Sequence, residues 1–105
     1  MQRGDIFELR MPKAVGHEQA GRRFGVVVRS DVLLPRSVVL VAPTSVSARP
    51  ASIRPVIEIE GMSTKVLVEH VGAVDVTRLS SLVGRVSTEA MWAVDDRLCT
   101  VLVLR

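Results

Sequence analysis

The chain has 105 residues, of which 48% are hydrophobic, and a formal net charge of +3. This length supports one domain over residues 1–105 with a core of its own. Cys99 is the only cysteine, which excludes an intrachain disulfide and a paired-cysteine metal or redox site. We expect a cytoplasmic protein without contact to membranes. The N-terminus lacks the apolar core of a signal peptide, and no segment approaches the roughly 18 apolar residues of a membrane span.

The basic side chains are unevenly distributed along the chain. Residues 1–54 carry nine basic and four acidic side chains, whereas residues 55–105 carry five and seven. This asymmetry favours an anionic partner for the N-terminal half, with nucleic acid as the first candidate, although a well-solvated surface gives the same counts. The mean hydropathy of +0.32 is high for a small monomer and predicts that a second copy of the chain covers part of the apolar surface.

The first half of the chain predicts three strands separated by loops. Residues 5–10 alternate polar and apolar side chains, as a half-buried strand does. Pro12, Gly16 and Gly21 then interrupt the pattern and predict a loop of about a dozen residues, of a length that often carries function. The β-branched runs 24–30 and 37–43 predict two further strands, which are joined by a helical turn that Pro35 ends.

The second half predicts three more strands and a terminal helix. A polar loop at 45–55 precedes expected strands at 56–60, 65–74 and 82–87, with a turn or short 3₁₀ element at 75–81. Many strands without alternating helices indicate an α+β, mainly β fold built as a small antiparallel barrel. Ser87 is a good N-cap for an amphipathic helix, and Met91 and Trp92 are expected as core or dimer contacts. The apolar residues at helical spacing are Met91, Val94, Leu98, Val101 and Leu102.

Several familiar catalytic motifs are excluded. The glycine spacing of residues 16–21 imitates the start of a phosphate-binding P-loop, but two arginines replace the lysine and hydroxyl pair and a strand follows. There is no G-x-S-x-G elbow, and His17 has no second histidine at the spacing of a zinc-binding helix. In a regular strand Glu69 and His70 point to opposite faces and do not share an ion. We therefore expect no metal and no cofactor.

A set of polar side chains in the first long loop and at strand ends remains unexplained. Cleavage of RNA by its own 2′-hydroxyl needs a base for that proton, donors around the non-bridging phosphate oxygens and help for the departing 5′ oxygen, but no metal. Arginines, a hydroxyl, and a carboxylate or histidine supply these groups. Each residue alone also fits a structural role as a surface charge, a turn cap or an interior histidine. The set is His17, Glu18, Gln19, Arg22, Arg23, Thr44, Ser45, Glu69 and His70.

Five runs, in one order along nearly the whole chain, resemble the MazF/PemK (Kid) family of bacterial toxin–antitoxin systems. They are RGDIFEL, GHEQAGRRFGVVV, VAPTS, VEHVGAVD and LVGRVSTEAMWAVDDRL. The resemblance implies an SH3-like barrel with a terminal helix, a homodimer, and a metal-independent, sequence-specific endoribonuclease toxin that cleaves single-stranded RNA. It also implies a cognate antitoxin whose acidic, initially disordered C-terminal segment neutralises the enzyme.

Site residues carried over by position form a small set. The family's catalytic arginine falls on Arg23 and its catalytic threonine on Thr44. His17 matches the histidine of the GHEQ run, and Glu69 aligns with a carboxylate used as a base. The base is therefore expected to be Glu69 or His17. The residues expected to contact RNA are Glu18, Gln19, Arg22, Ser45, Ser47 and His70.

Two positions depart from the family pattern, and two other functions stay open. Phe24 replaces the usual proline, and Leu67 replaces a second catalytic arginine, so a mechanism with that arginine as acid is in doubt. A CcdB-like toxin that binds DNA gyrase and a non-catalytic binding module use the same barrel.

Tyrosine is absent and aromatic residues are few, so RNA recognition is expected to use hydrogen bonds from loop side chains such as Gln19 rather than stacking.

Overall fold

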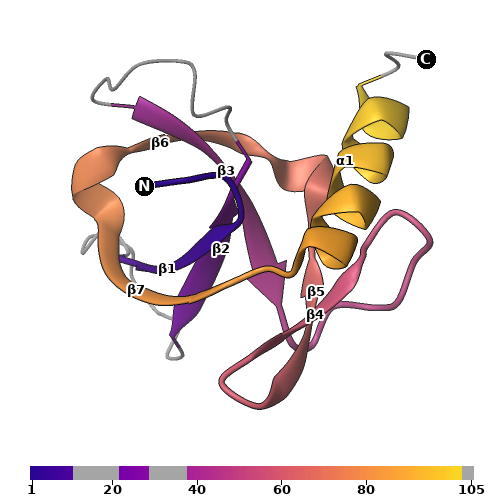
Figure 1. Ribbon diagram of the computed structural model, residues 1–105, viewed down its shortest axis with the longest axis horizontal. Helices are drawn as coiled ribbons and strands as arrows, with labels where there is room; N and C mark the ends of the chain where they lie inside the picture. The colour runs from indigo at the N-terminus through magenta and orange to yellow at the C-terminus, as the bar shows by residue number, and fades with distance from the viewer. Residues whose placement is uncertain (11–21, 29–37, 103–105) are drawn as a thin grey trace.

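Seven strands and one C-terminal α-helix make up residues 1–10, 22–28 and 38–102, which are the residues that this computed structural model describes (Figure 1). Two 3₁₀ turns, η1 (Val68–His70) and η2 (Val76–Arg78), flank β6, and the helix α1 spans Thr88–Val101. The predicted α+β, mainly β fold is confirmed. The strands are β1 (Asp5–Leu9), β2 (Arg23–Val27), β3 (Val38–Ser45), β4 (Val56–Ile59), β5 (Met62–Val66), β6 (Gly72–Asp75) and β7 (Leu79–Arg85).

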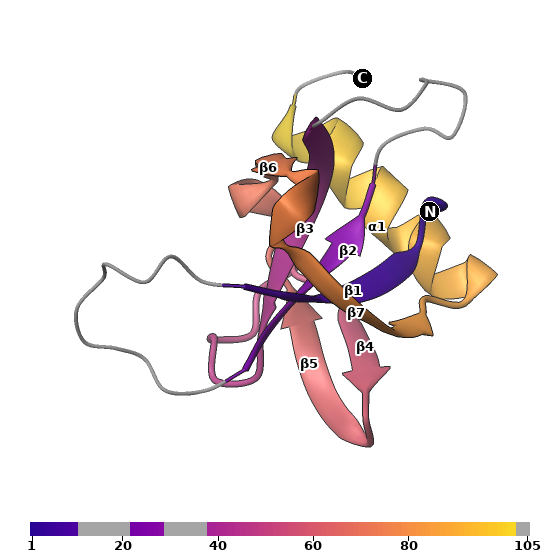
Figure 2. The ribbon, with the colours of Figure 1, turned by 90° about the vertical axis from the view of Figure 1, so that its left-hand side faces the viewer.

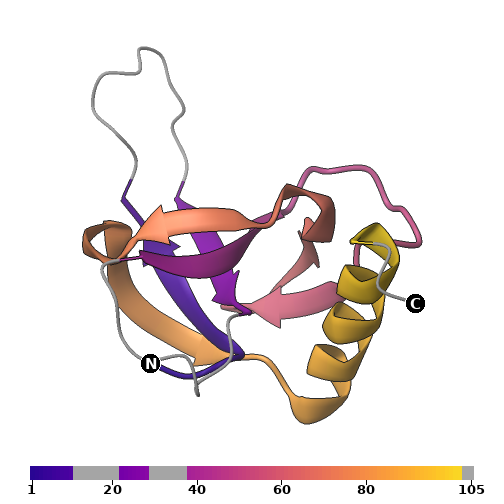
Figure 3. The same cartoon turned by 90° about the horizontal axis from the view of Figure 1, so that it is seen from above.

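The strands form one curled antiparallel sheet in the order β4-β5-β3-β2-β1-β7, with β6 also paired to β3. β2 lies between β1 and β3 (Figure 2). The long strand β3 joins the two parts of the sheet. Its first half pairs with β6, from Val38 opposite Asp75 to Val41 opposite Gly72, and its last two residues pair with β5 (Figure 3). The sheet curls into a half-barrel, which confirms the predicted barrel with a terminal helix.

The prediction of one strand over residues 65–74 is wrong. The chain ends β5 at Val66, makes the turn η1 and only then enters β6. The backbone N–H of Leu67 donates to the carbonyl of Pro43 at 2.8 Å, which fixes η1 to β3. The turn lets the chain leave the end of β3 and pair again with its first half. The run is apolar on both faces, so its pattern does not reveal the break. The predicted element at 75–81 is confirmed as η2, whereas the helical turn expected between the second and third strands lies outside the described residues.

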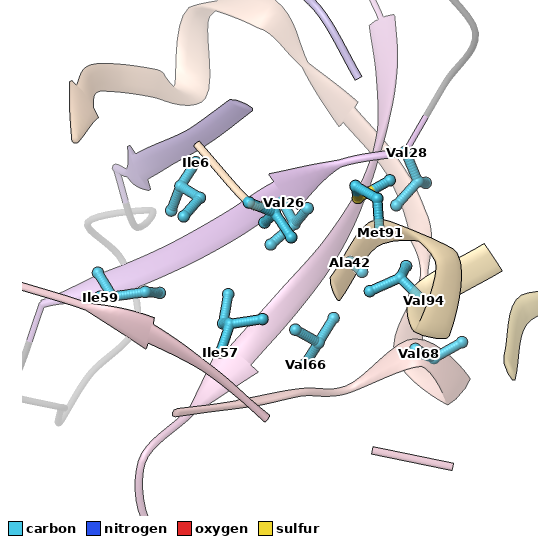
Figure 4. Close-up of a cluster of buried hydrophobic side chains, with 11 residues drawn as sticks. Ile6, Val26, Val28, Ala42, Ile57, Ile59, Val66, Val68, Met91 and Val94 are labelled. Atoms are coloured by element: carbon cyan, nitrogen blue, oxygen red, sulfur yellow. The ribbon is translucent and has the colours of Figure 1, made fainter. Parts of the chain in front are cut away.

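Branched aliphatic side chains fill the core, as Figure 4 shows. Neighbouring strand residues point to opposite faces, so the burial of both Val26 and Val27 means that β2 is covered on both sides. This double burial explains its uninterrupted β-branched run. A smaller cluster on the other face contains Val27, Val39 and Val41. The main cluster consists of Ile6, Val26, Val28, Ala42, Ile57, Ile59, Val66, Val68, Val86, Met91 and Val94.

The C-terminal helix α1 begins as predicted. The Ser87 hydroxyl accepts a hydrogen bond from the backbone N–H of Ala90 at 3.1 Å and satisfies one of the unpaired donors of the first turn. Met91 and Val94 are buried as expected, but Leu102, which follows the last helical residue Val101, is exposed. Trp92 is 67% exposed, so the first of its two expected roles, a core contact, is wrong, while the dimer contact stays a prediction. With 14 residues α1 is too short to cross a bilayer, and no other described helix meets the length and apolarity required.

Candidate active site

The start of β2 and the end of β3 bring two predicted site residues together. The strands are antiparallel, with Gly25 opposite Pro43, so Arg23 at the first position of β2 lies near Thr44 at the end of β3. Thr44 is 6% exposed, and its hydroxyl donates to the backbone carbonyl of Phe24 at 3.2 Å. This bond connects the two strand ends directly. Thr44 is held in the sheet and Arg23 is exposed, so this corner combines a fixed hydroxyl with an accessible guanidinium.

Two cavities adjoin this corner and share part of their walls. The first has a volume of about 420 Å³ and also contains His70 and Arg78. The second has a volume of about 380 Å³ and also contains Arg22 and Glu60. Volumes of this order are typical of pockets for small ligands or ligand fragments. The residues that line both cavities are Arg23, Phe24, Thr44 and Ser45.

Arg22 is held between two carboxylates at the second cavity. Its guanidinium donates to Glu8 at 3.1 and 3.0 Å and to Glu60 at 2.8 and 3.3 Å. It also lies over the ring of Phe24, 4.9 Å from the centroid. The hydrogen bond from Arg22 lowers the pKa of Glu8, and the bonds to Glu8 and Glu60 raise the pKa of Arg22. The arginine therefore stays protonated, with its charge offset by two anions.

Glu60 reaches this cluster through a tight turn between β4 and β5. Ile59 and Met62 are paired in the register, and the two residues between them have positive φ, 52° at Glu60 and 83° at Gly61. Such a pair is typical of a two-residue hairpin turn, in which glycine at the second position relieves the strain. Glu60 and Glu8 were not among the residues predicted for the site. The E-G turn was a visible signal for the hairpin, but no sequence spacing relates residues 8, 22 and 60.

Glu69 forms a separate ion pair beside the first cavity. Arg54 donates from Nε at 2.8 Å and contacts the same oxygen, Oε2, from Nη2 at 2.7 Å. Among the described side chains, Oε1 of Glu69 is buried without a hydrogen-bond partner. Burial is the largest single influence on the pKa of Glu69 and raises it. The hydrogen bond from Arg54, a backbone hydrogen bond and the nearby positive charges outweigh burial, and the pKa lies below its ordinary value.

Glu69 and His70 are neighbours in space, against the expectation that they point to opposite faces. Both belong to the 3₁₀ turn η1, and His70 Nε2 lies 3.7 Å from Glu69 Oε2. The expectation was wrong because it assumed a regular strand. Even so, no group of three or more potential metal ligands occurs in the part of the chain that the structure describes.

The structure thus gathers most of the predicted site residues that it describes. Arg23, Thr44 and Ser45 form the wall between the cavities, while Arg22 and Ser47 line the second cavity. His70 lines the first, and Glu69 is absent from the described lining of both. The three predicted residues of the first long loop, His17, Glu18 and Gln19, lie outside the described residues.

Comparison with known proteins assigns the sequence to one family. The model of the PemK-like, MazF-like toxin of type II toxin–antitoxin systems matches residues 2–102. A candidate toxin of Mycobacterium tuberculosis, Rv3098A, is 48% identical over 61 residues, which are 58% of this chain and 57% of that protein. The match thus spans little more than half the length of that relative.

Solved structures of toxins share the fold. An endoribonuclease in complex with its cognate antitoxin from a mycobacterial species superposes with a TM-score of 0.80 at 15% identity, covering 100% of this chain and 97% of that chain. The toxin MazF-mt6 of Mycobacterium tuberculosis gives 0.79 at 15% identity, covering 96% and 98%. A MazE–MazF structure from Deinococcus radiodurans gives 0.81 at 20% identity, covering 100% and 97%. Because the family model matches nearly the whole chain, residues 2–102, the chain belongs to the PemK-like, MazF-like toxins of type II toxin–antitoxin systems.

Proposed function

We propose that the protein is a sequence-specific, metal-independent endoribonuclease that cleaves single-stranded RNA through attack by the 2′-hydroxyl. The observation that carries the proposal is the wall shared by two cavities, in which Arg23 and Thr44 lie together. A phosphate at this wall places the nucleosides on either side of it in different cavities. Single-stranded RNA fits such a site because its bases are free to turn into separate pockets.

Arg23 and Thr44 are suited to different tasks at the phosphate. A guanidinium remains protonated at ordinary pH, so Arg23 is a poor proton donor and acts as a fixed clamp for the charge that builds up on the non-bridging oxygens. The Thr44 hydroxyl donates to the carbonyl of Phe24 in the free protein and is buried in a fixed position. When RNA binds, rotation about the Cβ–Oγ bond directs the O–H to the phosphate instead.

The predicted base was Glu69 or His17. The ion pair with Arg54 and the lowered pKa make Glu69 a weak base, and His17 lies outside the described residues. In this proposal RNA also receives hydrogen bonds from Arg22 and from the hydroxyls of Ser45 and Ser47, which line the second cavity. A gyrase-binding or purely binding role leaves the clustering of Arg23 and Thr44 without a purpose.

The partners follow from the family and from charge. We propose a cytoplasmic homodimer that a cognate antitoxin neutralises through an acidic C-terminal segment. Carboxylates of such a segment imitate phosphates, so the antitoxin competes with RNA for the basic N-terminal half and binds more weakly as salt rises. Binding that is indifferent to salt, or that leaves RNA bound, contradicts this competition.

The experiment is cleavage of a long single-stranded RNA by purified protein in EDTA, with the 5′ ends of the products sequenced. Cleavage at one short motif is expected, with 2′,3′-cyclic phosphate on the upstream product. Arg23→Ala should slow cleavage about a hundredfold or more, the scale of a lost oxyanion donor. Arg97→Ala, on α1 and outside the described lining of both cavities, is the matched control. Strict dependence on a divalent metal, or near-normal cleavage by folded Arg23→Ala protein, contradicts the proposal.

A further inference from the structure

His70 is held rigidly at the first cavity. Its backbone N–H donates to the carbonyl of Leu67 at 2.9 Å, and Leu67 in turn donates to Pro43, the residue before Thr44. Val68 in the same turn is fully buried and anchors it to the core. The imidazole itself is 60% exposed and lines the cavity that Arg23 and Thr44 also line. The fold therefore couples the position of His70 to the strand end that carries Thr44.

The carboxylate of Glu69 lies next to the imidazole of His70, and an ion pair holds it in place. Oε2 of Glu69 lies 3.7 Å from Nε2 of His70 and is fixed from the other side by Arg54. The unpartnered oxygen Oε1 of Glu69 leaves capacity for one more donor, because a carboxylate accepts several hydrogen bonds. The separation of 3.7 Å between Nε2 and Oε2 is a few tenths of an ångström longer than a hydrogen bond. Contacts of this kind are often long in a free enzyme and shorten when substrate binds.

We propose that His70 is the group that takes the proton from the attacking 2′-hydroxyl, and that Glu69 and Arg54 are positioning residues that hold its ring. The inference rests on the proposed endoribonuclease function. With the Nε2–H directed at Glu69, the other ring nitrogen, Nδ1, is the unprotonated acceptor of a residue that lines the cavity. A neutral imidazole accepts a proton near pH 7, whereas an ion-paired carboxylate does so poorly.

The step balances without a metal or a co-reactant. Nδ1 of His70 accepts the 2′-hydroxyl proton, the 2′ oxygen forms a bond to phosphorus, and the bond from phosphorus to the 5′ oxygen breaks. The departing 5′ oxygen takes a proton from water, and the imidazolium returns its proton to solvent. The charged groups around the ring are Glu69 and Arg54 on one side and, lining the cavity, Arg23 and Arg78. The carboxylate stabilises the imidazolium that forms.

Single-turnover cleavage in EDTA by His70→Ala tests the role of the ring. The rate at saturating RNA should fall a hundredfold or more, the usual contribution of a general base, with a change of less than about threefold in the RNA concentration that gives half the maximal rate. Added imidazole should restore part of the rate in His70→Ala but not in Arg23→Ala. Because His70 is exposed, its substitution should leave the circular dichroism spectrum unchanged.

The positioning roles of Glu69 and Arg54 are tested by the pH at which the cleavage rate is half maximal. Glu69→Gln removes an anion beside the imidazolium and should move this midpoint down by roughly half a pH unit, whereas Arg54→Gln removes a cation and should move it up. Glu58→Gln and Arg97→Gln are the matched controls and should leave it in place. NMR titration of the His70 ring protons without RNA should show shifts of the same opposite signs, and this measurement does not depend on cleavage.

The outcomes separate the two proposals. Absence of cleavage by the wild-type protein overturns the endoribonuclease proposal and this inference with it. Cleavage by the wild-type protein that persists in folded His70→Ala overturns only the inference. So does a loss without rescue by imidazole, or a midpoint that Glu69→Gln and Arg54→Gln leave unchanged.

Discussion

At the scale of single residues, the hydroxyl of Thr44 can be separated from its shape. Thr44→Val keeps the branched side chain but removes the donor, and it leaves the Phe24 carbonyl without this hydrogen bond. We expect cleavage about a hundredfold slower, because a lost donor to an oxyanion has this effect, and a modest loss of stability, about 1 kcal/mol. Thr44→Ser retains the hydroxyl and should stay within about tenfold of the wild-type rate. Thermal unfolding and single-turnover cleavage measure the two effects. Near-normal cleavage by Thr44→Val would show that the hydroxyl serves only the fold.

The two carboxylates that hold Arg22 should weaken RNA binding, because they offset its charge. Glu8→Gln or Glu60→Gln removes an anion paired with Arg22, which lines the second cavity, and leaves more of the Arg22 charge available to a phosphate. Binding of a non-cleavable 2′-O-methyl RNA should become roughly threefold to tenfold tighter at low salt, and the gain should shrink as salt rises. Fluorescence anisotropy measures this, with exposed Glu58→Gln on β4 as the control. Weaker binding would mean instead that the carboxylates hold Arg22 in its RNA-binding position.

At the scale of elements, the sequence predicted a strand well where turns bound it or where only one of its faces is buried. The strand β1 and the Ser87 cap of α1 were predicted from local signals, and both were confirmed, although burial in β1 does not alternate as expected. The turn η1 was missed because Val66 and Val68 are both fully buried, so the run around them keeps no polar rhythm. That miss also misplaced Glu69 and His70. The contact between Arg54 and Glu69 joins residues 15 apart, on either side of the β4–β5 hairpin, and no periodicity encodes it.

The close packing of β2 against β3 depends on a glycine. A Cβ atom at Gly25 would lie 2.3 Å from Cγ1 of Val41, a stiff side chain that is 2% exposed and has no room to move. Gly25→Ala should therefore destabilise the protein by about 1–3 kcal/mol, as overpacking does. The double variant Gly25→Ala with Val41→Ala should recover part of this loss, whereas Val41→Ala alone destabilises. Urea unfolding of the four proteins gives the coupling, and simple additivity would contradict the proposed clash.

At the scale of the whole molecule, the composition predicted a partner chain but not the surface that the partner covers. The high apolar content predicted a covering partner, and the described protomer exposes large apolar side chains on several elements. These include Val38 and Leu40 on β3, Leu82 on β7 and Trp92 on α1. Which of these faces meets another chain depends on the shape of two surfaces together, and a pattern along one chain carries no such information. The basic character of the N-terminal half is likewise only a sum of charges and does not locate a site. The site exists because Arg23 and Thr44 meet at two strand ends.

The homodimer is the prediction that these exposed side chains support. Light scattering at micromolar concentration should give twice the chain mass of 11.4 kDa, and the unfolding temperature should rise with protein concentration, because association stabilises the folded chain. Trp92 is the only tryptophan and is 67% exposed in the protomer, so its emission reports on its own surroundings. If Trp92 is the dimer contact that its apolar ring suggests, its emission should shift to the red on dilution, as the dimer dissociates and water reaches the ring. A dimer whose emission is constant on dissociation would move the interface to another face, such as that of Val38 and Leu40. A monomeric mass would contradict the dimer itself, and the exposed apolar side chains would then need a different partner to cover them.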